Sequence, residues 1–75
     1  LAAYGEENVR KALNAGAVEL MLITNSIDEN RIEELAGIVE AQGGDWIILD
    51  KDGRDGKTLD GLGSIGAILR YKLQL

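Results

Sequence analysis

The chain has 75 residues, of which 45% are apolar, and a formal net charge of −5 at pH 7. It contains neither cysteine nor histidine, which excludes disulfides and thiolate or imidazole metal sites and removes the commonest general base. The acidic balance disfavours nucleic-acid binding, which uses a basic face, and no apolar run approaches the roughly 20 residues that span a bilayer. We therefore expect a cytoplasmic protein with one domain over residues 1–75 and no membrane association.

The first third of the chain predicts a helix followed by a strand. In "EENVRKALNAG" the apolar residues Val9, Ala12 and Leu13 recur with the spacing of one helical face, and Gly16 marks the end. The run "AVELMLIT" then has the length of a strand and contains one charge, Glu19. Such a run is typical of a strand that is buried on both faces, as in a parallel sheet.

The segment "SIDENRIEELAGIVEAQGG" returns to helical spacing. Ser26 or Asp28 can cap its start, and Gly43 and Gly44 end it. Gly37 lies inside this helix and destabilises it by about 1 kcal/mol relative to alanine, unless it permits close packing against a neighbour. The predicted buried face consists of Ile32, Leu35, Ala36 and Val39.

The remaining segments predict a second buried strand at "DWIILD", a polar loop at "KDGRDGK" and one short helical turn at "TLDGLG". A third strand, "IGAILRYKLQL", closes the chain, with Leu69, Tyr71, Leu73 and Leu75 alternating with polar residues. The order helix, strand, helix, strand, short helix, strand indicates a layered α/β sandwich with right-handed crossovers. The sequence does not give the order of the strands in the sheet.

Three glycines near the end of the chain, Gly61, Gly63 and Gly66, have the G-x-G-x-x-G spacing of a dinucleotide-binding loop. Such a loop leaves a strand and opens a helix, whose free N–H groups hold the pyrophosphate. Here the glycines precede a β-rich run, and no acidic residue follows about 20 positions later. We therefore interpret them as a tight entry into the last strand, with close packing of backbone.

The loop "DKDGRDGK" places Asp50, Asp52 and Asp55 near two glycines and invites comparison with a calcium site. An EF-hand loop needs a glutamate at its twelfth position and flanking helices. The twelfth residue is Gly61 counted from Asp50, or Gly63 counted from Asp52. A solvated turn is the better interpretation.

No catalytic set stands out in the sequence. Ser26 and Ser64 have no histidine to activate them, and spacing distinguishes no pair among the 13 acidic residues. Trp46 lies in a predicted strand and is expected to be buried or half-buried. The residues alone therefore indicate an α/β binding module without chemistry of its own and without a cofactor or metal.

Two phrases at the ends of the chain carry a family resemblance. "AYGEENVRKALNAGAVELMLIT" resembles the opening of the third domain of archaeal and eukaryotic class I peptide chain release factors, and "DGLGSIGAILRYKLQL" resembles its closing phrase. Between them, "RIEELAGIVEAQGGDWIIL" is similar to that domain's helix and second strand, so the likeness covers essentially the whole chain. Pelota, the ribosome-rescue paralogue, shares this domain.

The resemblance implies a three-layer α/β sandwich similar to the kink-turn-binding ribosomal protein fold. It also implies a non-catalytic domain that docks a translational GTPase, either a class II release factor or an elongation-factor-like protein. In the full-length factor the domain would further contact the recycling ATPase and the ribosome. The chain is then expected to be a fragment of a longer factor, because codon reading and peptide release belong to other domains of the family.

The partner-binding residues that the resemblance implies are Ile68, Leu69, Arg70 and Tyr71 in the closing phrase. Strand alternation sends Leu69 and Tyr71 to one face and Ile68 and Arg70 to the other. Tyrosine and arginine are favoured in protein interfaces. For Ile68 and Leu69 a place in the core is the competing interpretation, and for Arg70 and Tyr71 both interpretations stay open.

Several features of the sequence bear on the choice between the two branches of the family, the release factors and Pelota. "YGEENVRKAL" and "GAVE" favour the release factor slightly. Release factors usually carry an inserted subdomain after the first strand, whereas here "ITNSIDENRIEEL" passes straight to the next helix, as in Pelota. The stretch "GGD" at residues 43–45 ends a helix and is not the family's catalytic Gly-Gly-Gln loop, so we expect a domain that is not an enzyme.

A kink-turn RNA-binding domain is the alternative from another functional class. RNA binders of the related ribosomal fold open their first helix with a phrase like G-x-N-E-V-T-K, and the matching stretch here is "GEENVRK". Only Gly5 and Lys11 agree with the contact residues, and Glu7 stands where the RNA binders have asparagine. A carboxylate there repels phosphate, so direct RNA binding is the weaker hypothesis.

Overall fold

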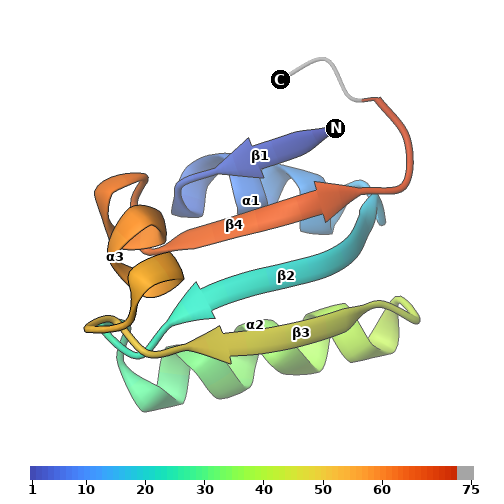
Figure 1. The fold of residues 1–75 in the computed structure, drawn as a ribbon. Coiled ribbons are helices and arrows are strands. Elements are labelled where there is room, and N and C mark those ends of the chain that lie inside the picture. The colour runs from blue at the N-terminus through green and yellow to red at the C-terminus, as the bar shows by residue number, and fades with distance from the viewer. Residues whose placement is uncertain (73–75) are drawn as a thin grey trace.

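The computed structural model describes residues 1–72, which form a four-stranded sheet with three helices (Figure 1). The α/β class expected from the sequence is confirmed. In chain order the elements are β1 (Ala2–Tyr4), α1 (Glu6–Asn14), β2 (Val18–Thr24), α2 (Glu29–Ala41), β3 (Asp45–Leu49), α3 (Arg54–Gly61) and β4 (Ile65–Leu69).

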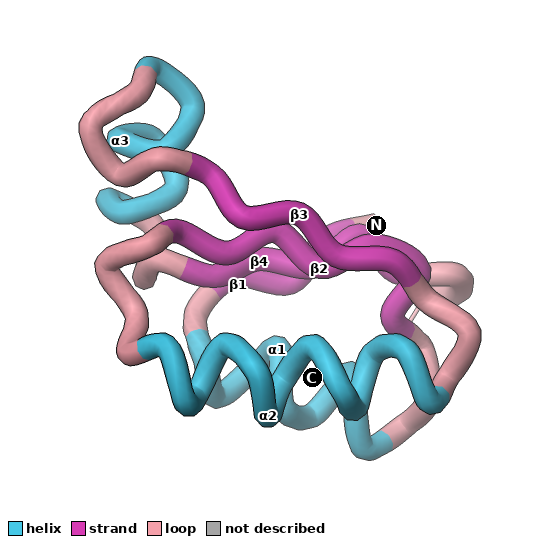
Figure 2. Tube along the Cα trace, turned by 90° about the horizontal axis from the view of Figure 1, so that it is seen from below, coloured by secondary structure: helices cyan, strands magenta, loops and turns pink. Residues whose placement is uncertain are grey.

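The strands lie in the order β1-β4-β2-β3. The pair β2 and β3 is parallel and is connected through α2, whereas β4 runs antiparallel to both β2 and β1. The sheet is therefore mixed rather than parallel. Helices α1 and α2 cover one face, and α3 lies beyond the other face at one end of the sheet (Figure 2). Much of that second face is left without a helix, and we call it the open face.

The hydrophobic core fills the space between the sheet and the layer formed by α1 and α2. Both helical faces predicted from the sequence point into it: all seven of their apolar residues are buried. From β2, Met21 and Ile23 reach the same core and are wholly buried. Strand β2 has β4 on one side and β3 on the other. Its burial on both faces, expected from the sequence, is not observed, because Leu20 and Leu22 lie on the open face and are only half-buried.

The two core helices begin and end close to the predicted residues. Of the two candidate caps for α2, Asp28 is used: its carboxylate accepts a hydrogen bond from the backbone N–H of Asn30 at 3.1 Å. Helix α1 lacks a side-chain cap but carries Glu6 and Glu7 in its first turn, where negative charge is favourable.

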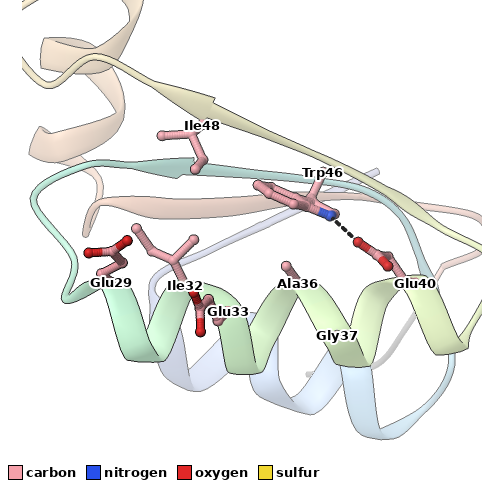
Figure 3. A pocket seen from close by; sticks show the side chains of 8 residues that line it. All are labelled: Glu29, Ile32, Glu33, Ala36, Gly37, Glu40, Trp46 and Ile48. Atoms are coloured by element: carbon pink, nitrogen blue, oxygen red, sulfur yellow. Dashed lines mark hydrogen bonds between the residues drawn. The ribbon is translucent and has the colours of Figure 1, made fainter.

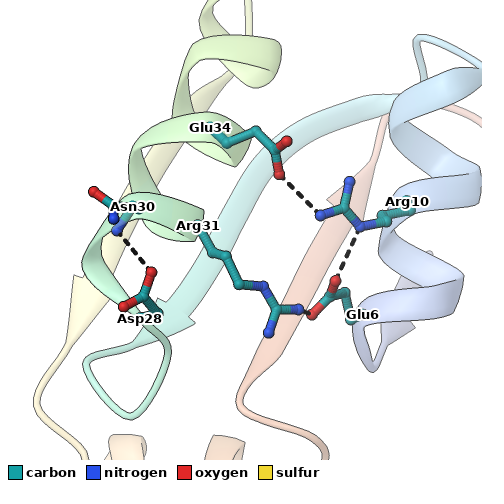
Figure 4. Close-up of polar contacts among 6 residues, drawn as sticks. All are labelled: Glu6, Arg10, Asp28, Asn30, Arg31 and Glu34. Carbon is teal, nitrogen blue, oxygen red and sulfur yellow. Dashed lines mark hydrogen bonds and ion pairs between the residues drawn. The ribbon is translucent and has the colours of Figure 1, made fainter.

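A small network of ion pairs connects α1 to α2 on the solvent side (Figure 4). Arg10 contacts Glu6 and Glu34, each at 3.0 Å, and Arg31 also pairs with Glu6. These side chains are partly exposed, so each pair adds only about 0.2–1 kcal/mol to stability. The network's larger consequence is electrostatic, because two of the eight basic residues are neutralised by neighbouring carboxylates.

Strand β1 was not predicted. Only three residues form it, and they are too few to show a strand period. Its pairing is nevertheless complete, with Ala2, Ala3 and Tyr4 opposite Ile68, Ala67 and Gly66 of β4. Ala3 is buried while its two neighbours are exposed.

The prediction of a buried strand at "DWIILD" was wrong. Strand β3 is an edge strand, with β2 on one side only, and Ile47 and Ile48 are 46% and 45% exposed. An apolar run gives no information about how many neighbours a strand has, which explains the error. The exposed isoleucines are unusual on an edge, where charged residues are a common protection against association.

Helix α3 is longer than the single turn predicted and begins at Arg54, inside the segment predicted as a loop. Gly56 explains how this sequence forms a helix there: its Cα lies against the backbone of Asp50 and leaves no room for a Cβ. Leu59 then anchors the helix against the end of the sheet and is almost fully buried.

The last strand is shorter than predicted, since β4 ends at Leu69. The backbone N–H of Arg70 donates to the carbonyl of Ala17 at 2.8 Å, and Arg70 and Tyr71 lie beyond the strand. Leu73 and Leu75, predicted to continue the alternation, lie outside the described residues.

Asp60 connects α3 to the end of β2 through two short hydrogen bonds. Its carboxylate accepts from the hydroxyl of buried Thr24 at 2.6 Å and from that of Ser26 at 2.7 Å. The bonds from Thr24, and secondarily from Ser26 and Ser64, lower the pKa of Asp60 below its ordinary value of 3.8. A carboxylate with a lowered pKa stabilises the fold above that ordinary value, and the stabilisation is lost as the pH falls through the folded pKa.

We therefore expect Asp60→Asn to flatten the acid side of the stability profile. The free energy of unfolding of the wild-type domain should fall as the pH drops below about 4, and the variant should show a smaller fall. Urea denaturation between pH 2.5 and 7 measures both profiles. Equal slopes for the two proteins in the acid range would contradict the role assigned to Asp60.

Candidate protein-interaction surface

The closing phrase is divided between the two faces of the sheet. Leu69 points into the core and is only 7% exposed, whereas Ile68 lies on the open face and is 39% exposed. The opposite orientation of these neighbours agrees with the alternation predicted from the sequence. A direct contact with a partner is therefore geometrically available to Ile68, while Leu69 packs against the core cluster.

Arg70 and Tyr71 follow β4 directly, and their side chains attach this segment to the rest of the domain through hydrogen bonds. The Arg70 guanidinium donates to the carbonyls of Val18 at 3.2 Å and Gln42 at 2.9 Å. The Tyr71 hydroxyl donates to the carbonyl of Ala15 at 2.6 Å. Because the Tyr71 ring is still half-exposed, this residue is both anchored and accessible to a partner.

The open face carries apolar side chains in matching register across all four strands. Tyr4, Gly66, Leu22 and Ile47 stand opposite one another in one row. The next row consists of Ala2, Ile68 and Leu20 and ends on β3 at the exposed carboxylate of Asp45. Tyr4, Ile47 and Ile68 are exposed. Sequence reasoning missed Ile47 as a surface residue and did not place Tyr4 on this face, because both findings required the strand order and register.

A shallow hollow of about 320 Å³ lies at the α3 end of this face. It is lined mainly by apolar side chains, and exposed Leu62 forms part of its rim. The hollow adjoins the first of the two rows, because Tyr4 and Leu22 belong to both. The hollow is lined by Tyr4, Leu22, Leu49, Asp55, Thr58, Leu59 and Leu62.

Two of the three glycines with dinucleotide-loop spacing have structural explanations. A Cβ on Gly66 would lie 3.1 Å from the Tyr4 ring and 3.3 Å from Leu59, so the glycine lets the ring cross β4. Gly63 has a φ of 108°, and a Cβ placed on it would lie 3.0 Å from the Cα of Gly5. The expected tight entry and close packing are therefore confirmed for Gly63 and Gly66, but not for Gly61, which ends α3 and has open space at its Cβ position.

The aspartates of the "DKDGRDGK" segment serve local turn and helix geometry. Asp50 accepts a hydrogen bond from the backbone N–H of Asp52 at 2.9 Å. Asp55 lies instead in the first turn of α3, where a carboxylate is favourable. Within residues 1–72, no group of three or more acidic side chains is arranged to hold a metal ion.

A second concave surface lies between α2 and the edge strand β3 (Figure 3). Its volume is about 410 Å³, and it combines apolar side chains with three carboxylates. Trp46 is half-buried, as expected, and its indole N–H donates to Glu40 at 2.8 Å. We call this surface the α2–β3 groove; it is lined by Glu29, Ile32, Glu33, Ala36, Gly37, Glu40, Trp46 and Ile48.

Gly37 lies in the middle of α2 and lines this groove. Apart from its chain neighbours and the backbone of its own helix, no atom of the described residues lies within 4 Å of the place where its Cβ would be. One explanation considered for Gly37 from the sequence was close packing against a neighbouring element. The structure shows no such packing within the described residues of the domain. Gly37→Ala should stabilise the domain by about 1 kcal/mol, since alanine has the higher helix propensity and meets open space. Urea denaturation measures the change; a loss of stability would contradict this view of the position.

No helix among residues 1–72 combines the length and the apolar character required to cross a membrane. Candidate surfaces for partners include the open face with its rim, the α2–β3 groove and the anchored residues after β4. The open face and the α2–β3 groove lie on opposite sides of the sheet (Figure 3).

Comparison with known proteins gives a consistent result over the whole domain. Residues 1–73 match the family described as eRF1 domain 3. A Pelota homologue from Methanococcus aeolicus is 43% identical over 77 residues, an alignment that covers 99% of this chain and 22% of that protein. The chain therefore spans about a fifth of the length of the curated relatives it matches.

Two solved structures show the same fold at more than 30% identity. Dom34 of S. cerevisiae, described as a translation termination-like factor that interacts with Hbs1, matches 96% of this chain and 22% of its own, with 34% identity and a TM-score of 0.84. Archaeal Pelota in a ribosome-bound structure with ABCE1 matches 99% of this chain and 22% of its own, with 33% identity and a TM-score of 0.86.

Proposed function

The chain belongs to the eRF1 domain 3 family, the C-terminal domain shared by Pelota and the class I release factors, and on this basis we propose that it is a non-catalytic domain that docks a translational GTPase. The whole of residues 1–75 serves as one docking domain. Its activity is to hold the partner, while codon reading and peptide release belong to other parts of the longer factor.

The observation that carries the proposal is the set of exposed apolar side chains on the open face. Tyr4 on β1 and Ile47 on β3 belong to one cross-strand row, Ile68 on β4 belongs to the next row, and each of the three is more than a third exposed. Contiguous apolar surface of this kind is typical of protein-binding sites. Of the closing phrase, Ile68 supplies the apolar contact and Tyr71 an exposed aromatic ring, while Leu69 and Arg70 position them.

The Pelota branch is the better assignment within the family. The sequence phrases favoured the release factor slightly, but the relatives named above are Pelota homologues and Dom34. The segment between β2 and α2 spans only residues 25–28, so the inserted subdomain expected of release factors has no counterpart there. We therefore propose a domain from a ribosome-rescue factor, with the class I release factor as the alternative.

The partners follow from that assignment. Dom34 interacts with Hbs1, and archaeal Pelota has been seen with ABCE1 on the ribosome. By analogy, the partner of this domain is an Hbs1-like or elongation-factor-like GTPase, followed by contact with the recycling ATPase on cytoplasmic ribosomes.

Kink-turn RNA binding is the competing function, and the charges on α1 oppose it. Lys11, one of the two residues shared with the RNA binders, lies 3.8 Å from the carboxylate of Glu7. Arg10 is similarly engaged by Glu6 and Glu34. A helix whose cations are already paired offers little to a phosphate backbone.

A direct titration separates the two functions. The 75-residue domain is titrated with the purified GTPase by calorimetry and, in parallel, with a kink-turn RNA in a gel shift. We expect saturable GTPase binding and no RNA shift at physiological salt. A tight, salt-sensitive RNA shift without GTPase binding would overturn the proposal.

A further inference from the structure

We propose that the α2–β3 groove is a second docking site, which takes an extended, basic segment of a partner protein as an added strand on β3. This site is separate from the open face, because Trp46 and Ile48 point toward α2 (Figure 3) while Ile47 points to the opposite side of the sheet. Three features of the groove support the proposal independently: its backbone edge, its charge and its glycine.

The backbone edge of β3 is available for pairing. Among the described strands β3 has a neighbour only in β2, so the N–H and C=O groups on its outer side face solvent. Extended peptides bind exposed sheet edges by completing this hydrogen-bonding pattern, and their alternate side chains enter pockets beside the strand. The groove provides such a pocket beside Trp46 and Ile48 of β3.

The charge of the groove selects a basic partner. Glu29 and Glu33 are one helical turn apart, at positions i and i+4, where like charges destabilise a helix. No lysine or arginine of residues 1–72 forms an ion pair with either of them. Glu40 adds a third carboxylate at the other end of the groove, where it accepts from Trp46. Cationic side chains from a partner would neutralise this arrangement.

The spacing of the two carboxylates fits an extended chain. Four residues along a helix advance about 6 Å, and two residues along a strand advance about 6.7 Å. Two basic residues separated by one residue on an added strand therefore face Glu29 and Glu33 in turn. The next residue with the same orientation faces Gly37, which lies one further turn along α2.

Gly37 gives this third position its specificity. It lowers the helix propensity of α2 and has no neighbour in the described chain that explains it. The space above it is bordered by Ala36 and Trp46, so a large apolar side chain fits there. The recognised pattern is thus basic, any, basic, any, large apolar, read along the groove from Glu29 to Gly37.

A second copy of this chain is a poor occupant of the groove. The chain has a net charge of −5, and the groove itself contributes three carboxylates, so two copies would repel each other at this edge. Nucleic acid is disfavoured for the same electrostatic reason. A basic segment of another protein satisfies both the charge and the open edge.

The test uses synthetic peptides and the 75-residue domain, with Trp46 as the probe. Trp46 is the only tryptophan in the chain and lines the groove. The binding peptide is Ser-Thr-Lys-Thr-Arg-Thr-Leu-Thr-Ser, used together with its reversed sequence because either strand direction can pair with β3. In the two control peptides, Lys and Arg are replaced by Glu, or Leu is replaced by Gly.

We expect one direction of the basic peptide to shift Trp46 emission with a dissociation constant below about 1 mM, and to shift the amide resonances of β3. Both control peptides should bind at least about threefold more weakly. No response to either direction, or equal binding of the acidic control, would overturn the proposal.

Variants of the domain make the test independent of folding. Glu29→Gln combined with Glu33→Gln should weaken the peptide about threefold to tenfold, whereas Glu19→Gln with Asp52→Asn, which removes the same charge outside the groove, should not. Gly37→Gln should also weaken binding while improving helix propensity, so a loss of binding there cannot be a loss of fold. Unchanged binding in the Glu29, Glu33 and Gly37 variants would contradict the site.

Self-association provides the remaining check. Sedimentation of the unliganded domain should show a monomer. A dimer that protects the β3 amides from hydrogen exchange would show that a second copy occupies the edge, and would overturn the proposal. Because the peptide test contains no GTPase, its failure leaves the proposed docking through the open face unaffected.

Discussion

Replacing Ile68 with aspartate is expected to weaken binding of the translational GTPase about 30-fold or more while the domain remains folded. Ile68 is the residue of the closing phrase that combines an apolar side chain with a position on the open face, and it is 39% exposed. A central apolar contact in an interface typically contributes about 2 kcal/mol or more, and a buried unpaired carboxylate is unfavourable in addition. Calorimetry with the purified GTPase measures the loss.

Ile38→Asp is the matched control for this variant. Ile38 has nearly the same exposure, 36%, but it lies on α2, in the layer on the opposite side of the sheet (Figure 2). It should bind the GTPase like the wild type. If both variants bind normally, the open face is not the docking surface; if both lose binding equally, a general loss of structure or charge accounts for the effect.

Gly56→Ala is expected to destabilise the domain by about 3 kcal/mol, a large effect for the addition of a single methyl group. The added Cβ would overlap the carbonyl oxygen of Asp50 and lie 2.6 Å from its carbonyl carbon. Backbone atoms cannot rotate away as a flexible side chain can, so α3 must shift. For a domain of this size the total stability is about 4–11 kcal/mol, and the midpoint of thermal unfolding should fall by more than about 10 °C.

Gly61→Ala in the same helix separates this clash from a general effect of glycine. No atom lies within 4 Å of a Cβ placed on Gly61, so the substitution should leave stability unchanged or increase it slightly. Calorimetric unfolding of the two variants gives the comparison. Equal midpoints for both would show that the close approach of α3 to Asp50 is not maintained in solution.

The elements that could be predicted from the sequence are those long enough for their apolar pattern to repeat several times. Helices α1 and α2 show the apolar spacing of one face over two or more turns, and every predicted core residue in them is buried. Strand β2 was predicted correctly as an apolar strand, but the expected burial on both faces was wrong, because Leu20 and Leu22 on the open face are only half-buried. In the two helices the local pattern and the tertiary environment impose the same requirement.

The predictions were wrong for elements whose structure or burial depends on tertiary contacts and whose sequence pattern is short. Strand β1 has three residues, and β3 is as apolar as a central strand although it lies at an edge. Helix α3 contains two glycines and has no strong apolar period. Its position depends on the contact between Gly56 and Asp50, which no local rule anticipates.

The candidate surfaces were only partly predictable for the same reason. Alternation alone placed Ile68 and Leu69 on opposite faces, but only the sheet showed which face is open. The anchoring of Arg70 on Val18 and Gln42 joins residues 52 and 28 positions apart. The row formed by Tyr4 and Ile47 likewise requires the strand order.

The most direct test of docking through the open face is a methyl NMR titration of the isotopically labelled domain with the partner GTPase. Docking there predicts that the methyl resonances of Leu22, Ile47 and Ile68 shift or broaden first, while those of Ile38 on the opposite layer keep their positions. Changes confined to Ile38 and the α2 side, with the open-face resonances unaffected, would contradict it.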